Sequence, residues 1–260
     1  MCAYDRSGLG WSEPGPGPFD GESIARELRT LLQSAGESGP YVLVGHSSGG
    51  MLVRIYYQLF PDEVAGLVLV DPGIPTEFYE PGEDLEATCG WRCPVARLLA
   101  SLGVFRRMYA GIMTNPEYPA AVLPQTRALL GTPAATHAWT NAMARIGRTA
   151  VQTMANDDLH AVPLVILRSQ DFGLDEDVDE EIHRRRSARR ERILTGMREI
   201  LDLSSRSRGP IVVEGSNHES IIMYDRHATV VSEEIDEIVR SIRLSTTAAR
   251  SIVSGRATIP

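Results

Sequence analysis

The chain has 260 residues, of which 34 are acidic and 26 basic, so its formal net charge is −8. This length fits one large α/β domain or two small ones, and the acidic balance argues against nucleic acid as a main partner. No apolar run reaches the roughly 18 residues of a membrane span. The N-terminus lacks the basic and apolar regions of a secretory signal. We therefore expect a cytoplasmic protein with no membrane partner.

The cysteines give no sign of a disulfide framework or a metal site. There are three, an odd number, which does not suit complete pairing. Cys89 and Cys93 are four residues apart with no histidine nearby, and a metal site needs more ligands than these two. We expect reduced thiols, no metal and no organic cofactor.

The first elements expected are the end of a strand and a helix. Residues 2–5 have the pattern of a short strand, and residues 6–18 are rich in glycine and proline, as in a long loop. Asp20 suits the N-cap of a helix that ends before Gly36. The helical spacing places four apolar residues on one face of this helix: Ile24, Leu28, Leu31 and Leu32.

Residues 41–60 combine a strand, a tight turn and a helix. The strand, residues 41–44, leads into Gly-His-Ser-Ser-Gly, a G-x-S-x-G pattern centred on Ser47, and helical spacing follows over residues 51–60. Small residues are expected at Gly45 and Gly49 because a side chain at either would collide with neighbouring backbone. The strained turn would hold the Ser47 hydroxyl above the sheet. It would also place it at a helix N-terminus whose free N–H groups can stabilise an oxyanion.

A third strand, Ala65–Asp71, is almost continuously apolar, as expected for a strand buried on both faces. Strands alternating with helices predict a parallel sheet flanked by helices. Residues 73–161 contain no strand-like run, and an insertion of this length is far longer than an ordinary loop. We interpret it as a helical cap. Its larger apolar residues could line a pocket, although each is better explained by the cap's own core: Phe78, Tyr79, Trp91, Phe105, Met108, Tyr109 and Met113.

The sheet resumes at Val162–Arg168, and a charged helix follows over about residues 175–203. Its arginines are interpreted as a solvated face because acids are interleaved with them. The last strand is Ile211–Glu214, and a closing helix covers about residues 229–242. The predicted organisation is a core of residues 1–72 and 162–245, a helical cap of residues 73–161 and a flexible tail of residues 246–260.

Three polar residues follow predicted parallel strands, at the edge where such sheets bind ligands. Ser47 is the candidate nucleophile, His218 the general base and Asp171 the acid that orients the imidazole. Asp71 and Asp175 remain alternatives for the acid. For Asp71 we favour a helix-capping role before a proline turn.

These motifs together resemble those of the α/β-hydrolase superfamily, in particular its cap-bearing esterases and lipases. The resemblance rests on four stretches and on the chain order Ser, Asp, His: residues 3–12, 45–50, 61–72 and 215–218. It implies an α/β-hydrolase fold, with a mostly parallel sheet, flanking helices and a helical cap inserted between strands. A serine at position 47 implies ester-type chemistry, because the dehalogenases and epoxide hydrolases of this fold use aspartate there.

The chain also departs from the family pattern. In the family, about three strands and a His-Gly turn precede the Tyr-Asp-Arg loop, and that turn supplies one of two oxyanion donors. Only the N–H of Ser48 is expected here, and losing one such donor typically costs about 10²–10³ in turnover. Residues 2–5 would lack a partner strand, and residues 41–44 would form an open apolar edge. We expect an N-terminally truncated core, in which Met1 is not the natural start.

The sequence thus predicts a serine hydrolase that acts on a carboxylic ester or similar small-molecule acyl substrate through an acyl-enzyme on Ser47. The rival is a non-catalytic or truncated hydrolase scaffold with little activity. Within the enzyme class, a lyase, a carbon–carbon bond hydrolase or a cofactor-free haloperoxidase would use the same triad. His46, beside the nucleophile, is given no chemical role. The physiological substrate and the oligomeric state stay open.

Overall fold

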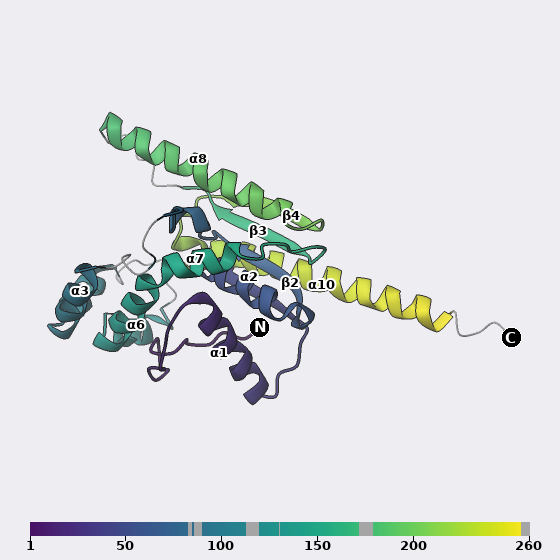
Figure 1. Cartoon of the computed structure of the whole chain (residues 1–260), viewed down its shortest axis with the longest axis horizontal. Coiled ribbons are helices and arrows are strands. Elements are labelled where there is room, and N and C mark those ends of the chain that lie inside the picture. The colour runs from purple at the N-terminus through teal and green to yellow at the C-terminus, as the bar shows by residue number, and fades with distance from the viewer. Residues whose placement is uncertain (83–84, 86–89, 113–119, 130, 172–178, 256–260) are drawn as a thin grey trace.

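The computed structural model describes residues 1–82, 85, 90–112, 120–129, 131–171 and 179–255. Four parallel strands form one sheet in the order β1-β2-β3-β4, with helices on both faces (Figure 1). The strands are β1 Tyr41–His46, β2 Val64–Val70, β3 Leu164–Ser169 and β4 Ser207–Val213. The predicted α/β class with a parallel sheet is confirmed. Because all four strands run the same way, their carboxyl ends meet at one edge.

The N-terminal residues form a loop instead of the predicted strand. Within the described residues, β1 pairs only with β2 and so lies at the sheet edge, and residues 1–6 have no strand to join. Asp5 holds the loop instead: its Oδ2 accepts the N–H of Trp11 at 3.0 Å, and its carbonyl oxygen accepts the Ser12 hydroxyl at 2.6 Å. Val44 of β1 is 40% exposed, so the expected open apolar edge is present.

One face of the sheet is covered by α2 (Gly49–Leu59) and α8 (Glu180–Asp202), with α1 (Gly21–Ser34) packed on α2. Asp20 caps α1 as predicted, accepting the N–H of Ser23 at 3.0 Å. Every second residue of β2 and β3 points to this face. The core there includes Leu67, Leu69, Leu164, Ile166, Ile55 and Met197.

The other face is covered by α9 (Ser220–Met223) and α10 (Asp225–Gly255). The alternate residues Val68, Val70, Val165 and Leu167 pack there against Ile221, Val231, Ile235 and Ile238. Residues 67–70 are each at most 1% exposed. The prediction that this strand is buried on both faces is therefore confirmed.

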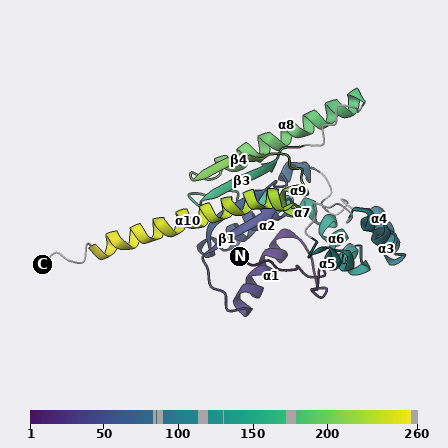
Figure 2. The same cartoon turned by 180° about the vertical axis from the view of Figure 1, so that it is seen from behind.

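The closing helix is much longer than predicted. α10 continues to Gly255 and protrudes from the body of the molecule (Figure 2). Residues 226–254 contain no glycine or proline and include Ala248 and Ala249, and alanine is the strongest helix former. The backbone is thus helical up to residue 255, and the flexibility expected from residue 246 onward stays a prediction.

The segment between β2 and β3 is helical, as predicted, and forms no strand within its described residues. After the short 3₁₀ helices η1 (Pro61–Glu63) and η2 (Pro75–Glu77), before and after β2, come five α-helices. These are α3 Arg92–Ser101, α4 Val104–Ile112, α5 Leu123–Leu129, α6 Pro133–Ala144 and α7 Ile146–Met154. α7 packs against α1 and α2, so the end of this segment joins the core. The division into core and cap at residues 73 and 161 stays a prediction.

The predicted apolar residues of the cap have different surroundings. Phe78 and Tyr79 pack on a small cluster formed by Met51, Ile146 and Ala150. Of the others, Trp91 and Met108 are exposed, Phe105 is half-buried, and the side chain of Tyr109 and all of Met113 lie outside the described part of the chain.

Cys93 is disulfide-bonded, whereas Cys2 is a free, exposed thiol. The expectation of reduced thiols is therefore wrong for Cys93, because an odd number of cysteines does not exclude a disulfide. Cys89 lies outside the described residues.

None of the helices in the described ranges combines the length and the apolarity needed to cross a membrane.

Candidate functional site

Ser47 lies at a strained turn between β1 and α2. Its φ is +57°, a region that non-glycine residues seldom adopt. A Cβ added at Gly45 would lie 2.3 Å from the carbonyl oxygen of Gly49, so glycine is required there as predicted. The same expectation is wrong for Gly49, where a Cβ would meet nothing within 4 Å. The second tight position is Gly50, whose added Cβ would lie 2.8 Å from the Cβ of Pro72.

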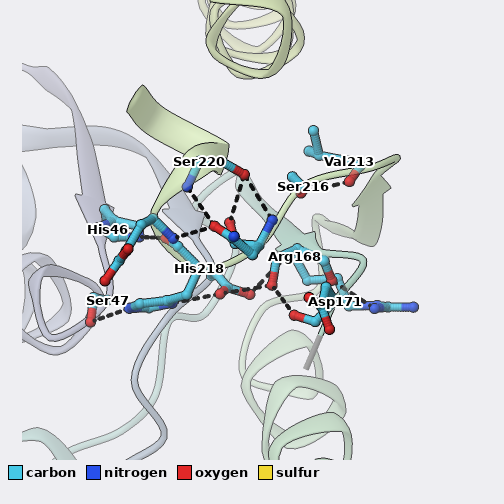
Figure 3. Close-up of polar contacts among 12 residues, drawn as sticks. His46, Ser47, Arg168, Asp171, Val213, Ser216, His218 and Ser220 are labelled. Carbon is cyan, nitrogen blue, oxygen red and sulfur yellow. Dashed lines mark hydrogen bonds and ion pairs between the residues drawn. The ribbon is translucent and has the colours of Figure 1, made fainter. Parts of the chain in front are cut away.

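Three side chains form a hydrogen-bonded line at the carboxyl edge of the sheet. The Ser47 Oγ lies 3.0 Å from Nε2 of His218, and Nδ1 of the same ring lies 2.6 Å from Oδ2 of Asp71. Figure 3 shows Ser47 and His218 facing each other across the first of these contacts. The predicted nucleophile and general base are thus brought together.

The carboxylate in this line belongs to Asp71, not to the predicted Asp171. Asp171 supports the neighbouring loop through its main chain: its N–H donates to the Ser216 carbonyl at 2.9 Å, and its own carbonyl accepts the Ser169 hydroxyl at 3.2 Å (Figure 3). Both aspartates satisfy the order Ser, Asp, His, so chain order could not separate them. Asp71 directly follows β2, the strand beside β1. Its predicted capping role is also wrong, and Asp175 lies outside the described residues.

The Asp71 carboxylate is buried and fully hydrogen-bonded. Oδ1 accepts the N–H of Ser169 and Oδ2 accepts its hydroxyl, each at 3.0 Å, in addition to the contact with His218. Burial raises the pKa of Asp71, but the hydrogen bonds from His218 and Ser169 and the charge of His218 outweigh it, leaving the pKa below its usual value. The carboxylate is therefore ionised at neutral pH and can stabilise a protonated imidazole.

The loop that carries His218 is held by its own polar side chains. Oδ1 of Asn217 accepts the N–H groups of Glu219 at 3.1 Å and Ser220 at 2.8 Å, and the Ser216 hydroxyl donates to the Val213 carbonyl at 2.6 Å. Figure 3 shows this network beside the imidazole. The His218 side chain is 51% exposed, so the site is open to solvent from one side.

His46 is a second histidine at the site. Its Nε2 lies 2.8 Å from the carbonyl oxygen of His218, and the two ring centroids are 4.6 Å apart. Burial, followed by the nearby His218, holds the pKa of His46 below its usual value. A neutral ring can donate Nε2–H to that carbonyl and so help to fix the His218 backbone. The sequence signal was its position beside Ser47 at the end of β1.

Ser48 is the N-cap residue of α2 and offers a backbone donor. Its N–H forms no hydrogen bond within the described residues, which leaves it available to an oxyanion on a group attacked by Ser47. A cavity of about 80 Å³ adjoins Ser48 and lies between the N-terminal loop, α1, α2, α6 and α7. Apolar side chains such as Leu52 and Ile146 line it, together with the charged Arg6 and Glu27.

Within the described ranges, no group of three or more His, Cys, Asp or Glu side chains is placed to hold a metal ion.

The fold and this serine site define a class of protein. Residues 1–88 match the family model described as the alpha/beta hydrolase fold. Among solved structures, a thermophilic esterase from Thermogutta terrifontis superposes with a TM-score of 0.56 at 20% identity, covering 92% of this chain and 78% of that one. The chain has the α/β-hydrolase fold, and its first 88 residues resemble that family.

Two curated relatives match shorter stretches. The chain is 29% identical over 120 residues to the uncharacterized protein YbdG of Bacillus subtilis, covering 45% of this chain and 35% of that protein. It is 35% identical over 103 residues to a (lyso)-N-acylphosphatidylethanolamine lipase of Homo sapiens, covering 38% of this chain and 30% of that protein. The chain thus spans about a third of the length of each of these relatives.

Proposed function

We propose that this chain is a serine hydrolase that acts on a carboxylic ester or similar small-molecule acyl substrate. The observation that carries the proposal is the hydrogen-bonded line from Ser47 through His218 to Asp71. A hydroxyl, an imidazole and a buried carboxylate in this arrangement are what nucleophilic acyl transfer requires. The similarity to an esterase and a lipase favours ester chemistry over the other reactions of this triad.

The residues suggest the following steps. Oγ of Ser47 attacks the carbonyl carbon while Nε2 of His218 takes its proton, and Asp71 stabilises the resulting imidazolium. The N–H of Ser48 donates to the oxyanion. The bond to the leaving alcohol then breaks, and His218 returns the proton to the alcohol oxygen, which leaves an acyl-enzyme. Water attacks the acyl carbon, His218 takes a proton from it, and the acid departs as Ser47 regains its proton.

One observation favours the rival function, a hydrolase scaffold with little turnover. The described residues around Ser47 offer one identified backbone donor, Ser48 N–H, where a full oxyanion site uses two. The two proposals differ in the rate of acyl transfer and not in the nucleophile, so they are separated by measuring labelling and turnover independently.

The first test is labelling with a fluorophosphonate, followed by intact mass measurement. We expect a single adduct on the native chain and none on Ser47→Ala. Ser48→Ala is the matched control, because it removes the neighbouring hydroxyl and keeps the backbone N–H. It should be labelled like the native chain. A native chain that stays unlabelled would contradict the proposed nucleophile.

The second test is turnover of p-nitrophenyl acetate. Turnover that is lost in Ser47→Ala supports the hydrolase. Labelling at Ser47 without turnover above the Ser47→Ala background would support the scaffold.

A further inference from the structure

α3 is an apolar helix at one end of the molecule, opposite the protruding end of α10 (Figures 1 and 2). It packs on α6. Cys93 and Ala100, two turns apart on the inner side, are 5% and 1% exposed. Arg97, from the same side, donates from Nε to the Thr140 hydroxyl at 3.0 Å. These contacts fix which side of α3 faces the protein.

The opposite side of α3 is also apolar, and it faces solvent. Trp91, Val95, Leu98 and Leu102 follow one another at intervals of four, three and four residues, so they share one face of the helix. Their exposed fractions are 73%, 41%, 60% and 70%, in that order. A helix that is apolar all round is normally buried all round. Single exposed apolar residues are common, but a continuous stripe marks a surface that is covered by a partner.

Helices α3 and α4 themselves carry charge of one sign. Residues 92–112, which form α3 and α4, contain four arginines and no acidic residue. Arg92, Arg106 and Arg107 are exposed, and none of them forms an ion pair within the described ranges. The exposed Met108 lies beside the last two. The chain as a whole carries a net charge of −8, so the charge of these two helices is opposite in sign to that of the whole chain.

We propose that the outer face of α3, with the exposed Arg92, Arg106 and Arg107, binds the surface of an anionic phospholipid membrane. The stripe would enter the boundary between headgroups and acyl chains, where tryptophan is favoured, and the arginines would contact phosphates. Positive charge beside an apolar helix face is complementary to an anionic lipid surface. A second copy of the chain fits less well, because two α3 faces packed together would bring like charges into contact.

Such binding is peripheral. The sequence-based expectation of no membrane partner rested on the length of apolar runs. That length indicates whether a helix can span a membrane, but not whether a helix can bind the membrane surface. α6, on which α3 packs, also supplies Trp139 and Met143 to the cavity beside Ser48. The membrane face and the candidate active site are thus separated by a single helix.

The test is flotation of the chain with phosphatidylcholine vesicles, with and without phosphatidylglycerol. We expect binding to the vesicles that contain phosphatidylglycerol, weakened as ionic strength rises. Leu102→Glu should lower the partition coefficient about tenfold or more, because it places a charge in the apolar boundary. Leu244→Glu on α10 is the matched control: Leu244 is 72% exposed, against 70% for Leu102. It should bind like the native chain.

A second variant tests the proposal independently, in case Leu102→Glu does not fold. Arg106→Gln combined with Arg107→Gln keeps the stripe and should reduce both the binding and its salt dependence. Equal binding of Leu102→Glu and Leu244→Glu, or no binding of the native chain to phosphatidylglycerol vesicles, would overturn the proposal. So would a dimer that Leu102→Glu dissociates in the absence of vesicle binding, since the partner would then be a second copy.

The inference is independent of the proposed reaction. Ser47→Ala should bind vesicles like the native chain, because Ser47 is not part of the membrane face. Loss of fluorophosphonate labelling with vesicle binding retained would contradict only the proposed function. Labelling without vesicle binding would contradict only the membrane face.

Discussion

The carboxyl edge of the sheet and the outer face of α3 use apolar side chains in opposite ways. In the sheet, Leu67 and its neighbours are buried on both sides, and their burial fixes strands whose ends bring Ser47 and Asp71 together. On the outer face of α3, Leu98 is 60% exposed. Apolar residues that build a site are constrained by packing, whereas those of α3 remain free to meet a partner. This difference can be tested in both regions.

The largest expected effect is at the acid of the site. Asp71→Asn should lower kcat/KM for p-nitrophenyl acetate by about 10³–10⁴, because a neutral amide neither stabilises the imidazolium nor holds its tautomer. Asp171→Asn should change it much less, since His218 contacts Asp71 and not Asp171. A larger loss in Asp171→Asn than in Asp71→Asn would restore the sequence-based assignment.

The next effect compares equal truncations in the two regions. Leu67→Ala should lower the free energy of unfolding by about 2–5 kcal/mol, because Leu67 is fully buried. Leu98→Ala should change it by about 0.5 kcal/mol or less, as expected of an exposed position. Urea denaturation measures both. A marked loss in Leu98→Ala would show that the outer face of α3 is packed in solution, which would remove the basis for the membrane face.

The turn after β1 offers a smaller and more local comparison. Gly45→Ala should cost about 1–3 kcal/mol of folding free energy, because its Cβ would lie 2.3 Å from the Gly49 carbonyl oxygen. Gly49→Ala should be neutral or stabilise the fold by about 0.4–1 kcal/mol, because nothing lies within 4 Å of its added Cβ. Thermal unfolding of the two variants measures the difference. Equal losses of folding free energy in the two variants would mean that a side chain at Gly49 is as unfavourable as one at Gly45.

The smallest effect concerns pH. Because the folded pKa of His46 is below its unfolded value of about 6.5, the unfolded chain binds more protons between these two values. The contribution of neutral His46 is thus complete above about pH 6.5 and is lost as pH falls toward the folded pKa. His46→Asn should flatten the slope of Tm between pH 7 and pH 5. His183→Asn, at an exposed position on α8, should leave the slope of Tm against pH as it is in the native chain. If both variants keep that slope, His46 does not cause the pH dependence of Tm.

The sequence predicted the parts of the fold that depend on local pattern. Continuous apolar runs located β2 and β3, the glycine pattern located the turn at Ser47, and the position after the last strand located His218. The sequence could not identify the aspartate that contacts His218, because Asp71 and Asp171 each follow a strand and each satisfy the chain order. Only the sheet order and the path of the loop from β4 decide which one meets the imidazole.

Other features depend on contacts that no local pattern encodes. A strand at residues 2–5 needs a neighbour to pair with, and the described residues supply none. The disulfide at Cys93 depends on the path of the backbone, which the spacing of cysteines alone does not give. Of the apolar stripe of α3, only Trp91 was singled out from the sequence, and it was better explained by the cap's own core, whereas it is 73% exposed. Which of the two apolar sides of a helix is covered is decided by tertiary packing.

The backbone at Ser47 also limits how this nucleophile can change over evolution. Threonine carries the same hydroxyl chemistry, but a β-branched side chain at a φ of +57° is strongly disfavoured. Cysteine keeps an unbranched Cβ and fits the same turn. The backbone conformation at position 47 therefore permits a change from serine to cysteine. It disfavours a change to threonine, although threonine is chemically closer to serine.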